Sequence, residues 1–522
     1  MTERLVPTKN GFPTAYADKR TLHSRYDPRG EAEKYIGSLS LSPGIRFFIL
    51  IEPCLGYIIP VLQKQFPHAR LIVLHISDFF IAPEFPGEGI SRPPAFQAPL
   101  VSEAPPPAVW SPESAQTLEE FLEQEIPDIE GRYLKLIEWR PAMISYGDAY
   151  LALLSRVAAF IKRVDANKRT LRGFGRRWLR NGLKNIQLFT NPVRIRAGSV
   201  PLVITASGPS LEDTLPLLRE WKKKSPLFIM GVSSAVPALY EADLAPDLVV
   251  STDGGGWALV HLREAYRKIR RNCPGSHGKQ PFTLAAGLIA AIPSQYRDLP
   301  VLPISDGSLW QNILLTSLGI SFIILPQRGT VSASAMDLAF TLTGGQVVIT
   351  GLDLSHRDLR THARPYGFDQ LWEERAHRMN PVYSQVFIRE NIPVNPGSHG
   401  IYAAWFAGQL DRYPKRLCTL GNNNPVFNTL SSGDTGAFTT NGALPLVTAA
   451  GPLPPHSPAE AGEILIHALD TPQYGGRLLE ELGSLLGQDE GISGTGEEIP
   501  SNADMVKAEL YRMVRSPEAF HG

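Results

Sequence analysis

The sequence is poor in cysteine and has no net charge. Its three cysteines, Cys54, Cys273 and Cys418, are widely separated in the sequence and form no Cys-x-x-Cys pair. We therefore expect reduced thiols, as in a cytoplasmic protein, and neither a disulfide framework nor a zinc site. Basic and acidic residues both number 51, so no overall field would attract nucleic acid or an acidic membrane.

Long apolar runs are also missing. The longest apolar stretch, around residues 45–62, is broken by Glu52, Pro53 and Pro60, and is too short and interrupted to span a bilayer. The first residues, MTERLVPTKNG, contain no apolar segment typical of a signal peptide. We expect a soluble, cytoplasmic protein without a membrane span.

The chain is long enough for several hydrophobic cores. It has 522 residues, of which 43% are hydrophobic and 20% charged, the composition of an ordinary globular protein. We predict an α/β protein with two Rossmann-like parallel-sheet domains, a helical linker and a mainly α-helical C-terminal region. The predicted regions are a small N-terminal domain with a proline-rich connector (1–113), a basic helical segment (114–195), a larger central catalytic domain (196–395) and the C-terminal region (396–522).

The stretch PLVITASGPS, residues 201–210, is the strongest local signal. An apolar strand ends in the small-residue turn Ser207-Gly208-Pro209, and Ser210 follows at the expected start of a helix. Asp213 stands three residues later, as in a capping box. Such a turn presents backbone N–H groups and a helix dipole to an anion, so it predicts a phosphate site. The alternative is that the turn merely connects the strand to the helix.

A second strand, within APDLVVSTDGGG, ends before Asp253 and the glycines that begin with Gly254. A carboxylate after a strand, beside a flexible loop, can hold a hydrated divalent cation or a ribose hydroxyl. Asp253 is therefore a candidate ligand for magnesium or for a nucleotide. The alternative is that Asp253 only caps the next turn. Asp306 follows a further strand, VLPIS, and is another candidate contact.

A third segment with candidate site residues covers residues 329–363. It opens with the turn Gly329-Thr330-Val331-Ser332, continues as an apolar helix and ends in the strand QVVITG. The polar loop after this strand carries Asp353, His356 and His362. Titratable side chains that collect after a strand are typical of a site at the carboxyl edge of a parallel sheet. For each histidine, the alternative is a solvated loop residue.

Nine basic residues lie between Lys162 and Lys184, against the single acidic Asp165. Together with Phe174 and Trp178, this stripe invites comparison with nucleic-acid-binding proteins. The balanced total charge argues against nucleic acid, and we expect the glycines of the run to interrupt its helix. We interpret the stripe as a solvated basic face, with a position beside an anionic donor as the functional alternative.

The runs ASGPSL, PDLVVSTDGG and GTVSASAMDLAFTLTGGQVVITGLDL resemble the central domain of motility accessory factor proteins, which are bacterial enzymes. That domain is similar to the 6-hydroxymethylpterin diphosphokinase MptE-like family and, more distantly, to bacterial sialyltransferases. The resemblance covers most of residues 10–440. In the first domain, the family's glycine-rich turn is replaced here by Pro53-Cys54-Leu55-Gly56-Tyr57, which lacks the leading glycines.

The resemblance implies transfer of a nonulosonic, sialic-acid-like sugar from a CMP-linked donor to serine or threonine of flagellin, with magnesium as a candidate cofactor. It places the turn 207–210 near the nucleotide, Asp253 and Gly254 near the phosphate or its metal, and the turn 329–332 near the donor sugar. It makes His356 or His362 the candidate base, with Asp353 beside them as a further candidate catalytic residue. Two alternatives remain open: ATP-dependent diphosphate transfer to a pterin alcohol, and a non-catalytic flagellin-binding role.

Overall fold

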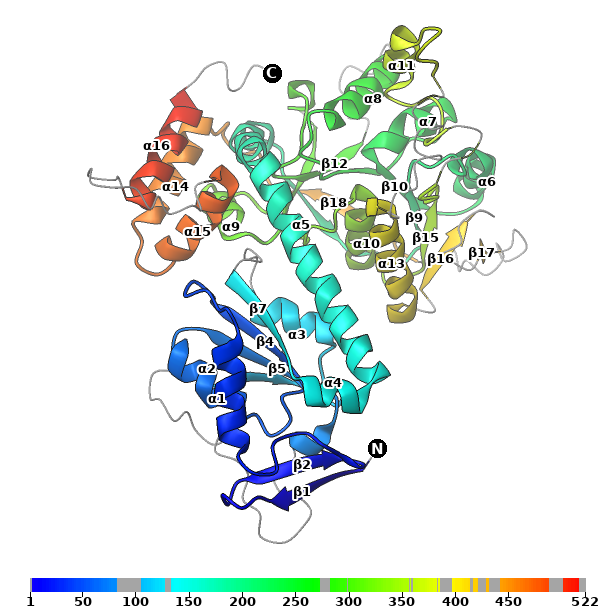
Figure 1. The fold of residues 1–522 in the computed structure, drawn as a ribbon. Helices are drawn as coiled ribbons and strands as arrows, with labels where there is room; N and C mark the ends of the chain where they lie inside the picture. The colour runs from blue at the N-terminus through cyan, green and yellow to red at the C-terminus, as the bar shows by residue number, and fades with distance from the viewer. Residues whose placement is uncertain are drawn as a thin grey trace. The chain divides into compact units, whose positions relative to one another are not determined.

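The computed structural model in Figure 1 describes most of the chain. The described residues are 2–81, 105–126, 133–272, 282–297, 299–355, 357, 360–382, 384, 397–413, 416–420, 429–430, 442–487 and 501–515. The chain divides into two compact units, Met1–Leu171 and Arg172–Gly522. This single division differs from the sequence prediction, which placed boundaries after residues 113, 195 and 395.

The first unit is built on a four-stranded parallel sheet of order β6-β5-β4-β7. Its central strands, FFILI and RLIVL, are almost entirely buried, as expected for apolar runs in a parallel sheet. The elements of this sheet are β4 (Phe47–Ile51), β5 (Arg70–Leu74), β6 (Ala108–Trp110), β7 (Leu134–Glu138), α1 (Pro28–Ser38), α2 (Ile58–Gln65), α3 (Leu118–Glu125) and α4 (Arg140–Tyr146). An antiparallel sheet precedes it, with strands β1 (Glu3–Pro7), β2 (Pro13–Ala17) and β3 (Arg20–Thr21).

Side chains of the first unit fill the space around the turn after β4. In the family that the sequence resembles, this turn carries glycines. The buried Glu52 carboxylate accepts hydrogen bonds from the backbone N–H groups of Cys54, Ile76 and Ser77, at 3.2, 2.6 and 3.2 Å. Glu52 and Cys54 have φ angles of +42° and +54°, a region that favours glycine. The imidazole of His23 accepts the N–H of Leu55 at 3.1 Å and is itself buried. The crevice of the first sheet is therefore occupied by side chains of the same unit.

The second unit is built on a nine-stranded parallel sheet of order β14-β13-β12-β11-β10-β9-β15-β16-β17. The four strands predicted between residues 196 and 351, at 202–204, 248–250, 301–305 and 346–351, correspond to β9, β11, β13 and β15. The strands are β9 (Leu202–Thr205), β10 (Phe228–Val232), β11 (Leu248–Ser251), β12 (Thr283–Gly287), β13 (Val301–Ser305), β14 (Ile323–Ile324), β15 (Val347–Thr350), β16 (Leu417–Leu420) and β17 (Thr429–Leu430). A separate antiparallel pair joins β8 (Val193–Arg196) to β18 (Leu446–Ala449).

Helices cover both faces of this sheet. Right-handed crossovers place the helices between β9 and β12 on one face, and the helices that flank β15 on the other. Figure 1 shows α10 and α13 side by side, and the ring of Phe340 in α10 stacks on Tyr413 just after α13, with centroids 3.8 Å apart. The helices are α6 (Leu211–Lys224), α7 (Val236–Glu241), α8 (Ala258–Asn272), α9 (Leu309–Ser317), α10 (Val331–Leu342), α11 (Asp369–Arg375) and α13 (Gly397–Arg412).

One helix, α5 (Asp148–Asn185), is continuous over 38 residues, although the sequence predicted that its glycines would interrupt it. Two of these glycines stand where neighbouring groups come close. A Cβ at Gly175 would lie 2.4 Å from the carbonyl oxygen of Leu485, and a Cβ at Gly182 would lie 2.6 Å from the ring of Trp310. Here glycine serves close packing, and the surrounding contacts outweigh its low helix propensity. The basic stripe is partly neutralised, because Arg163 pairs with Glu123 and Arg176 with Glu509.

The region predicted to be mainly helical after residue 396 contains three helices that pack on one another, but it also contributes β16 and β17 to the large sheet. Similarly, β7 lies inside the segment 114–195 that was predicted to be helical. The region after residue 396 is mainly helical, as predicted, but local patterns did not reveal β7 and β16, because they pair with β4 and β15, whose residues lie 87 and 70 positions earlier in the sequence. The C-terminal helices are α14 (Pro458–Leu469), α15 (Gly475–Leu486) and α16 (Asn502–Arg515).

No single helix in the described part of the chain is both long and apolar enough to cross a membrane. One pair of consecutive helices, Arg140–Tyr146 and Asp148–Val164, reaches the required length and composition together but bends by 119° between them. Its apolar side chains Tyr150, Leu153 and Val157 belong to the buried core of the first unit.

Candidate functional site

The order in which the chain adds strands to the large sheet reverses at β9. From β9 the chain adds strands towards β14 on one side, and then returns to place β15 on the other side of β9. In open parallel sheets, ligands bind at the carboxyl edge next to such a switch point. The loops that follow β9, β10, β11 and β15 therefore form the candidate site, which we call the switch-point crevice.

Ser210 and Asp353 tie the loops after β9 and β15 together. Asp353 is buried, and its carboxylate accepts the backbone N–H of Ser210 at 2.7 Å as well as the Ser210 hydroxyl. Ser210 forms no side-chain cap hydrogen bond within α6, so the predicted capping box with Asp213 is wrong. The physical reason is competition: a charged acceptor from another loop binds the serine more strongly than a local backbone N–H does. The start of α6 is therefore already bound to a carboxylate of the protein itself, that of Asp353.

Gly208 lies at the closest approach of the same two loops. Its N–H donates to the carbonyl of Gly351 at 2.7 Å, and a Cβ at this position would lie 2.7 Å from the Asp353 carboxyl carbon. The neighbouring Pro209 carbonyl accepts a hydrogen bond from Arg357 at 3.1 Å. The turn is therefore rigidly held on its Asp353 side.

Ser207 faces the open side of the turn. Its hydroxyl pairs with that of Ser234, which follows β10, at 2.8 Å, and its carbonyl accepts the N–H of Ala363 at 2.8 Å. This last bond brings the neighbouring residue, His362, to the edge of the crevice. The hydroxyl of Thr361 contacts His362 Nδ1 at 2.8 Å, and the imidazole stacks on Tyr366 with ring centroids 3.9 Å apart. The hydrogen bond and the stacking contact together fix the orientation of the His362 ring.

Two arginines fix the loop that carries His362. Arg357 pairs with Asp213, and Arg360 makes a two-oxygen contact with Glu212 at 2.9 and 3.0 Å. Both acidic residues lie in the first turn of α6, next to Ser207 in the sequence. These arginines are engaged by protein carboxylates and hold the loop against the helix. His356 and its neighbours at 358 and 359 lie outside the described residues.

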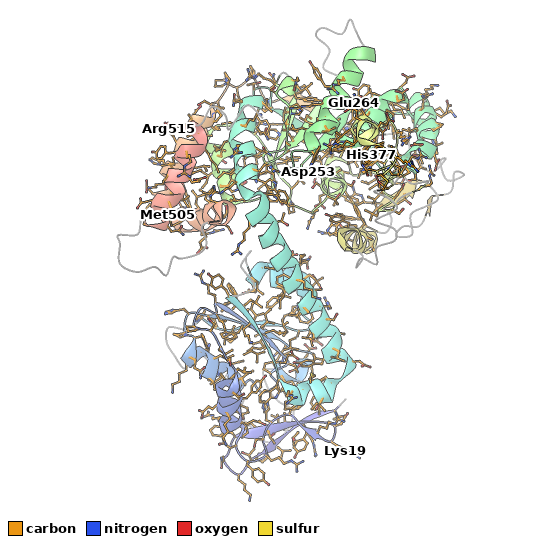
Figure 2. All side chains as sticks on the ribbon, turned by 45° about the horizontal axis from the view of Figure 1, so that its top comes forward. Lys19, Asp253, Glu264, His377, Met505 and Arg515 are labelled. Atoms are coloured by element: carbon orange, nitrogen blue, oxygen red, sulfur yellow. The ribbon has the colours of Figure 1, made fainter. Side chains whose placement is uncertain are left out.

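Asp253 is exposed in the loop after β11, and Figure 2 labels it in the second unit. Its Oδ1 accepts the N–H of Gly255 at 2.7 Å. Since β11 lies two strands from β9, it is separated from the Ser207 turn by about 10 Å at a spacing of about 4.8 Å per strand. A nucleoside phosphate can bridge that distance.

Asp253 also has to be weighed as a metal ligand. Within the described ranges, no group of three or more His, Cys, Asp or Glu side chains is arranged to hold a metal ion. Magnesium is commonly bound by one or two carboxylates while substrate phosphates and water supply its other ligands. The exposed Asp253 carboxylate fits that mode, in which the nucleotide brings most of the ligands.

The turn 329–332 begins α10, which packs across β9, β10, β11 and β15. Gly329 has a φ of +76° and lies against the ring of Tyr402, and Thr330 precedes the helix without a side-chain cap. Val331 and Ser332 form the first turn, which faces the carboxyl edge because α10 leads back into the parallel strand β15. Asp306, by contrast, follows β13, four strands from β9, or about 19 Å away. Its carboxylate contacts Ser308 and Gln327, so it belongs to a separate loop.

An aromatic cluster that was not predicted from the sequence lies beside His362. Phe368 lies 5.7 Å from Trp257 and 6.2 Å from Trp372, measured between ring centroids. His261 packs on Tyr366 and Phe368, and burial lowers its pKa to about 4, so this imidazole is neutral near pH 7. Ser234 was missed as well, although the pair Ser233-Ser234 follows the apolar run FIMGV in the same strand-then-polar pattern that identified Asp253.

A known family matches the part of the sequence that holds most of these loops. Residues 176–358 match the sequence model of the family described as 6-hydroxymethylpterin diphosphokinase MptE-like. The chain contains an MptE-like domain. This match confirms the resemblance predicted from the central motifs, and the matched region includes the Ser207 turn, Asp253 and Asp353. His362 lies just beyond its end.

Two whole-chain comparisons add context. An uncharacterized protein of Treponema pallidum (strain Nichols) is 26% identical over 296 residues, which are 56% of this chain and 61% of that protein. The chain thus matches about three fifths of that relative's length. A solved structure, the MAf glycosyltransferase from Magnetospirillum magneticum AMB-1, aligns with a TM-score of 0.49 and 14% identity, over 100% of this chain and 84% of that chain.

Proposed function

We propose that the MptE-like domain binds a nucleotide-activated substrate in the switch-point crevice and transfers a group from its phosphate to an acceptor hydroxyl. The observation that carries this proposal is the meeting of three kinds of group at one sheet edge. They are the paired hydroxyls of Ser207 and Ser234, the exposed carboxylate of Asp253, and the oriented imidazole of His362. Hydroxyls and a carboxylate suit phosphate and ribose, and an imidazole suits proton transfer near neutral pH.

In its specific form, the proposed reaction is glycosyl transfer. The donor is a CMP-linked nonulosonic acid, and the acceptor is a serine or threonine of flagellin, so that the protein would support flagellum assembly and motility. The motif resemblance of the central domain supports this choice over other nucleotide-dependent reactions. A large protein acceptor is also consistent with the additional first unit and C-terminal helices, which a small-molecule kinase would not need.

The residues of the crevice can be assigned roles in that reaction. The acceptor oxygen attacks the anomeric carbon while the bond from that carbon to the CMP phosphate oxygen breaks. His362 takes the proton from the acceptor hydroxyl. The first turn of α10, at Val331 and Ser332, offers backbone N–H groups to the negative charge that develops on the departing phosphate. Asp253 would hold the ribose hydroxyls, or a magnesium ion that would neutralise phosphate charge.

A diphosphokinase is the second candidate, since the matching family is described by that activity. In this reaction the same crevice would hold ATP with magnesium at Asp253, and the acceptor would be a pterin alcohol. The two candidates differ in nucleotide, in metal requirement and in acceptor, and can therefore be separated by binding.

Calorimetric titration of the protein with CMP and with ATP, each with and without magnesium, tests the proposal. Selective CMP binding supports the glycosyltransferase, and magnesium-dependent ATP binding supports the diphosphokinase. Asp253→Ala should weaken the binding that is found, whereas Glu220→Ala, an exposed residue paired only with Lys223 and Lys224, should leave it unchanged. Absence of binding to either nucleotide would reject both reactions and favour a non-catalytic, flagellin-binding role.

His362→Ala then tests the chemical step. The loss of one well-placed base typically lowers kcat by about 10²- to 10⁴-fold, and nucleotide affinity should stay within about threefold of the wild type. Transfer can be followed by the mass increase of flagellin incubated with a CMP-linked nonulosonic acid. A His362→Ala variant with full kcat would remove this residue from the mechanism.

A further inference from the structure

Helix α5 reaches the loop that carries Asp253. The side-chain amide nitrogen of Asn181 donates to the carbonyl oxygens of Gly254, at 3.1 Å, and Ile289, at 2.9 Å. An asparagine amide has two hydrogens, so both are used here. One side chain thus joins the loop after β11 to the loop after β12.

Trp178, one helical turn earlier, packs on the same loop. A Cβ at Gly254 would lie 2.4 Å from the Trp178 ring, so the indole rests directly against the glycine backbone. The two loops are also joined by a hydrogen bond from the N–H of Ala291 to the carbonyl of Asp253, at 2.9 Å. The backbone on both sides of Asp253 is therefore held by α5 and by the β12 loop.

We propose that Asn181 and Trp178 are positioning residues that set where the Asp253 carboxylate points in the switch-point crevice. Asp253 itself is exposed, and among the residues that the structure describes its carboxylate forms a hydrogen bond within its own turn, to the N–H of Gly255. Nothing in that turn fixes the direction of the loop as a whole, whereas the Asn181 amide and the indole do. This inference rests on the proposed function, because it treats Asp253 as a ligand-binding residue.

Asn185 provides a matched control one turn further along α5. Its amide nitrogen also donates to two carbonyls, those of Leu288 at 2.8 Å and Ala290 at 2.6 Å. It is buried, and both acceptors of its amide lie in the loop after β12, whereas one acceptor of the Asn181 amide lies in the Asp253 loop. A general loss of stability should therefore appear in both alanine variants, and a loss of positioning only in Asn181→Ala.

The test combines two measurements on the full chain. Amide hydrogen exchange at Gly255 should be accelerated in Asn181→Ala and stay near the wild-type rate in Asn185→Ala. The Kd for CMP should rise about tenfold in Asn181→Ala, because two hydrogen bonds no longer preorganise the Asp253 loop, and by less than threefold in Asn185→Ala.

Each outcome decides a separate point. If the wild type binds CMP and both variants change its Kd equally, or neither does, Asn181 is only structural and the inference is wrong. If the wild type binds ATP instead, the same comparison is made with ATP and magnesium. If the wild type binds neither nucleotide, the proposed function fails and the positioning role fails with it.

Discussion

At the scale of single residues, Gly208 shows how little space the crevice leaves on its inner side. Its backbone lies between Gly351 and Asp353, and any side chain would enter the volume of the Asp353 carboxylate. That carboxylate is already engaged with Ser210 and cannot rotate away without breaking two hydrogen bonds.

Gly208→Ala should therefore destabilise the protein by about 1–3 kcal/mol, the usual cost of inserting a methyl group into a well-packed region. Chemical denaturation measures the change in the free energy of unfolding. Gly256→Ala is the control, because a Cβ there has no heavy atom within 4 Å. Equal stability of the two variants would show that the loops after β9 and β15 are not in close contact.

His23 predicts a dependence of stability on pH. Burial lowers its pKa from 6.5 to about 3, so the imidazole is neutral in the folded protein and protonates mainly after unfolding. The unfolded state then binds more protons between about pH 6.5 and pH 3. Stability is consequently complete above pH 6.5 and falls as the pH decreases through this window.

Between pH 8 and pH 5, His23 alone should reduce the free energy of unfolding by about 2 kcal/mol. Denaturation of the wild type and of His23→Gln at both pH values isolates this contribution, because the other titrating groups are common to the two proteins. The same pH dependence in both proteins would mean that His23 is solvated and titrates normally.

At the scale of whole elements, the contact between α15 and α9 links the C-terminal helices to the large sheet. Glu481 of α15 accepts the N–H groups of Leu309 and Trp310 at 3.0 and 3.1 Å, and so satisfies the start of α9. Ser308 directly precedes α9, and its side chain forms no hydrogen bond that caps the helix. The burial of Glu481 raises its pKa, but these two backbone hydrogen bonds favour its charged form.

Glu481→Ala should cost about 1–2 kcal/mol, in the range measured for loss of a helix N-cap. Thermal denaturation should show a lower midpoint for this variant, while the exposed neighbour Glu480 can be replaced by alanine without effect. A midpoint for Glu481→Ala that equals that of Glu480→Ala would exclude the capping role.

The elements also show what the sequence could predict. Apolar runs such as LVVS, followed by Asp253, identified strands and their loops correctly, because a buried strand and its turn are local in sequence. The partner of Ser210 was not predictable in this way, since Asp353 is 143 residues distant. Likewise, glycine in α5 was read as a helix breaker, although Gly175 and Gly182 adjoin groups that no local pattern reveals.

At the scale of the whole molecule, the chain contains two parallel sheets with a switch-point turn, but the two turns differ. In the first unit, Glu52 takes the backbone N–H groups and His23 fills the adjoining space. In the second unit, the internal carboxylate of Asp353 binds at the start of α6, while Ser207 is half-buried and Asp253 is exposed. The absence of leading glycines near Cys54 was the one sequence signal of this difference.

The chain should accordingly bind one nucleotide molecule, through the second unit. Calorimetry should give a stoichiometry near one per chain, and Asp253→Ala should weaken that single event. A second binding event, retained in Asp253→Ala, would place a nucleotide site in the first unit and contradict the closed crevice described above.

The position of β9 between β10 and β15 has a consequence for synthesis of the protein. β10 leaves the ribosome soon after β9, but β15 begins 145 residues later, at Val347, and at 5–20 residues per second this takes about 7–30 s. During that interval the growing sheet would present β9 as an apolar, unpaired edge, which is a recognised hazard for aggregation. Nascent chains that stop before β15 should therefore depend on chaperones more strongly than chains that extend past it.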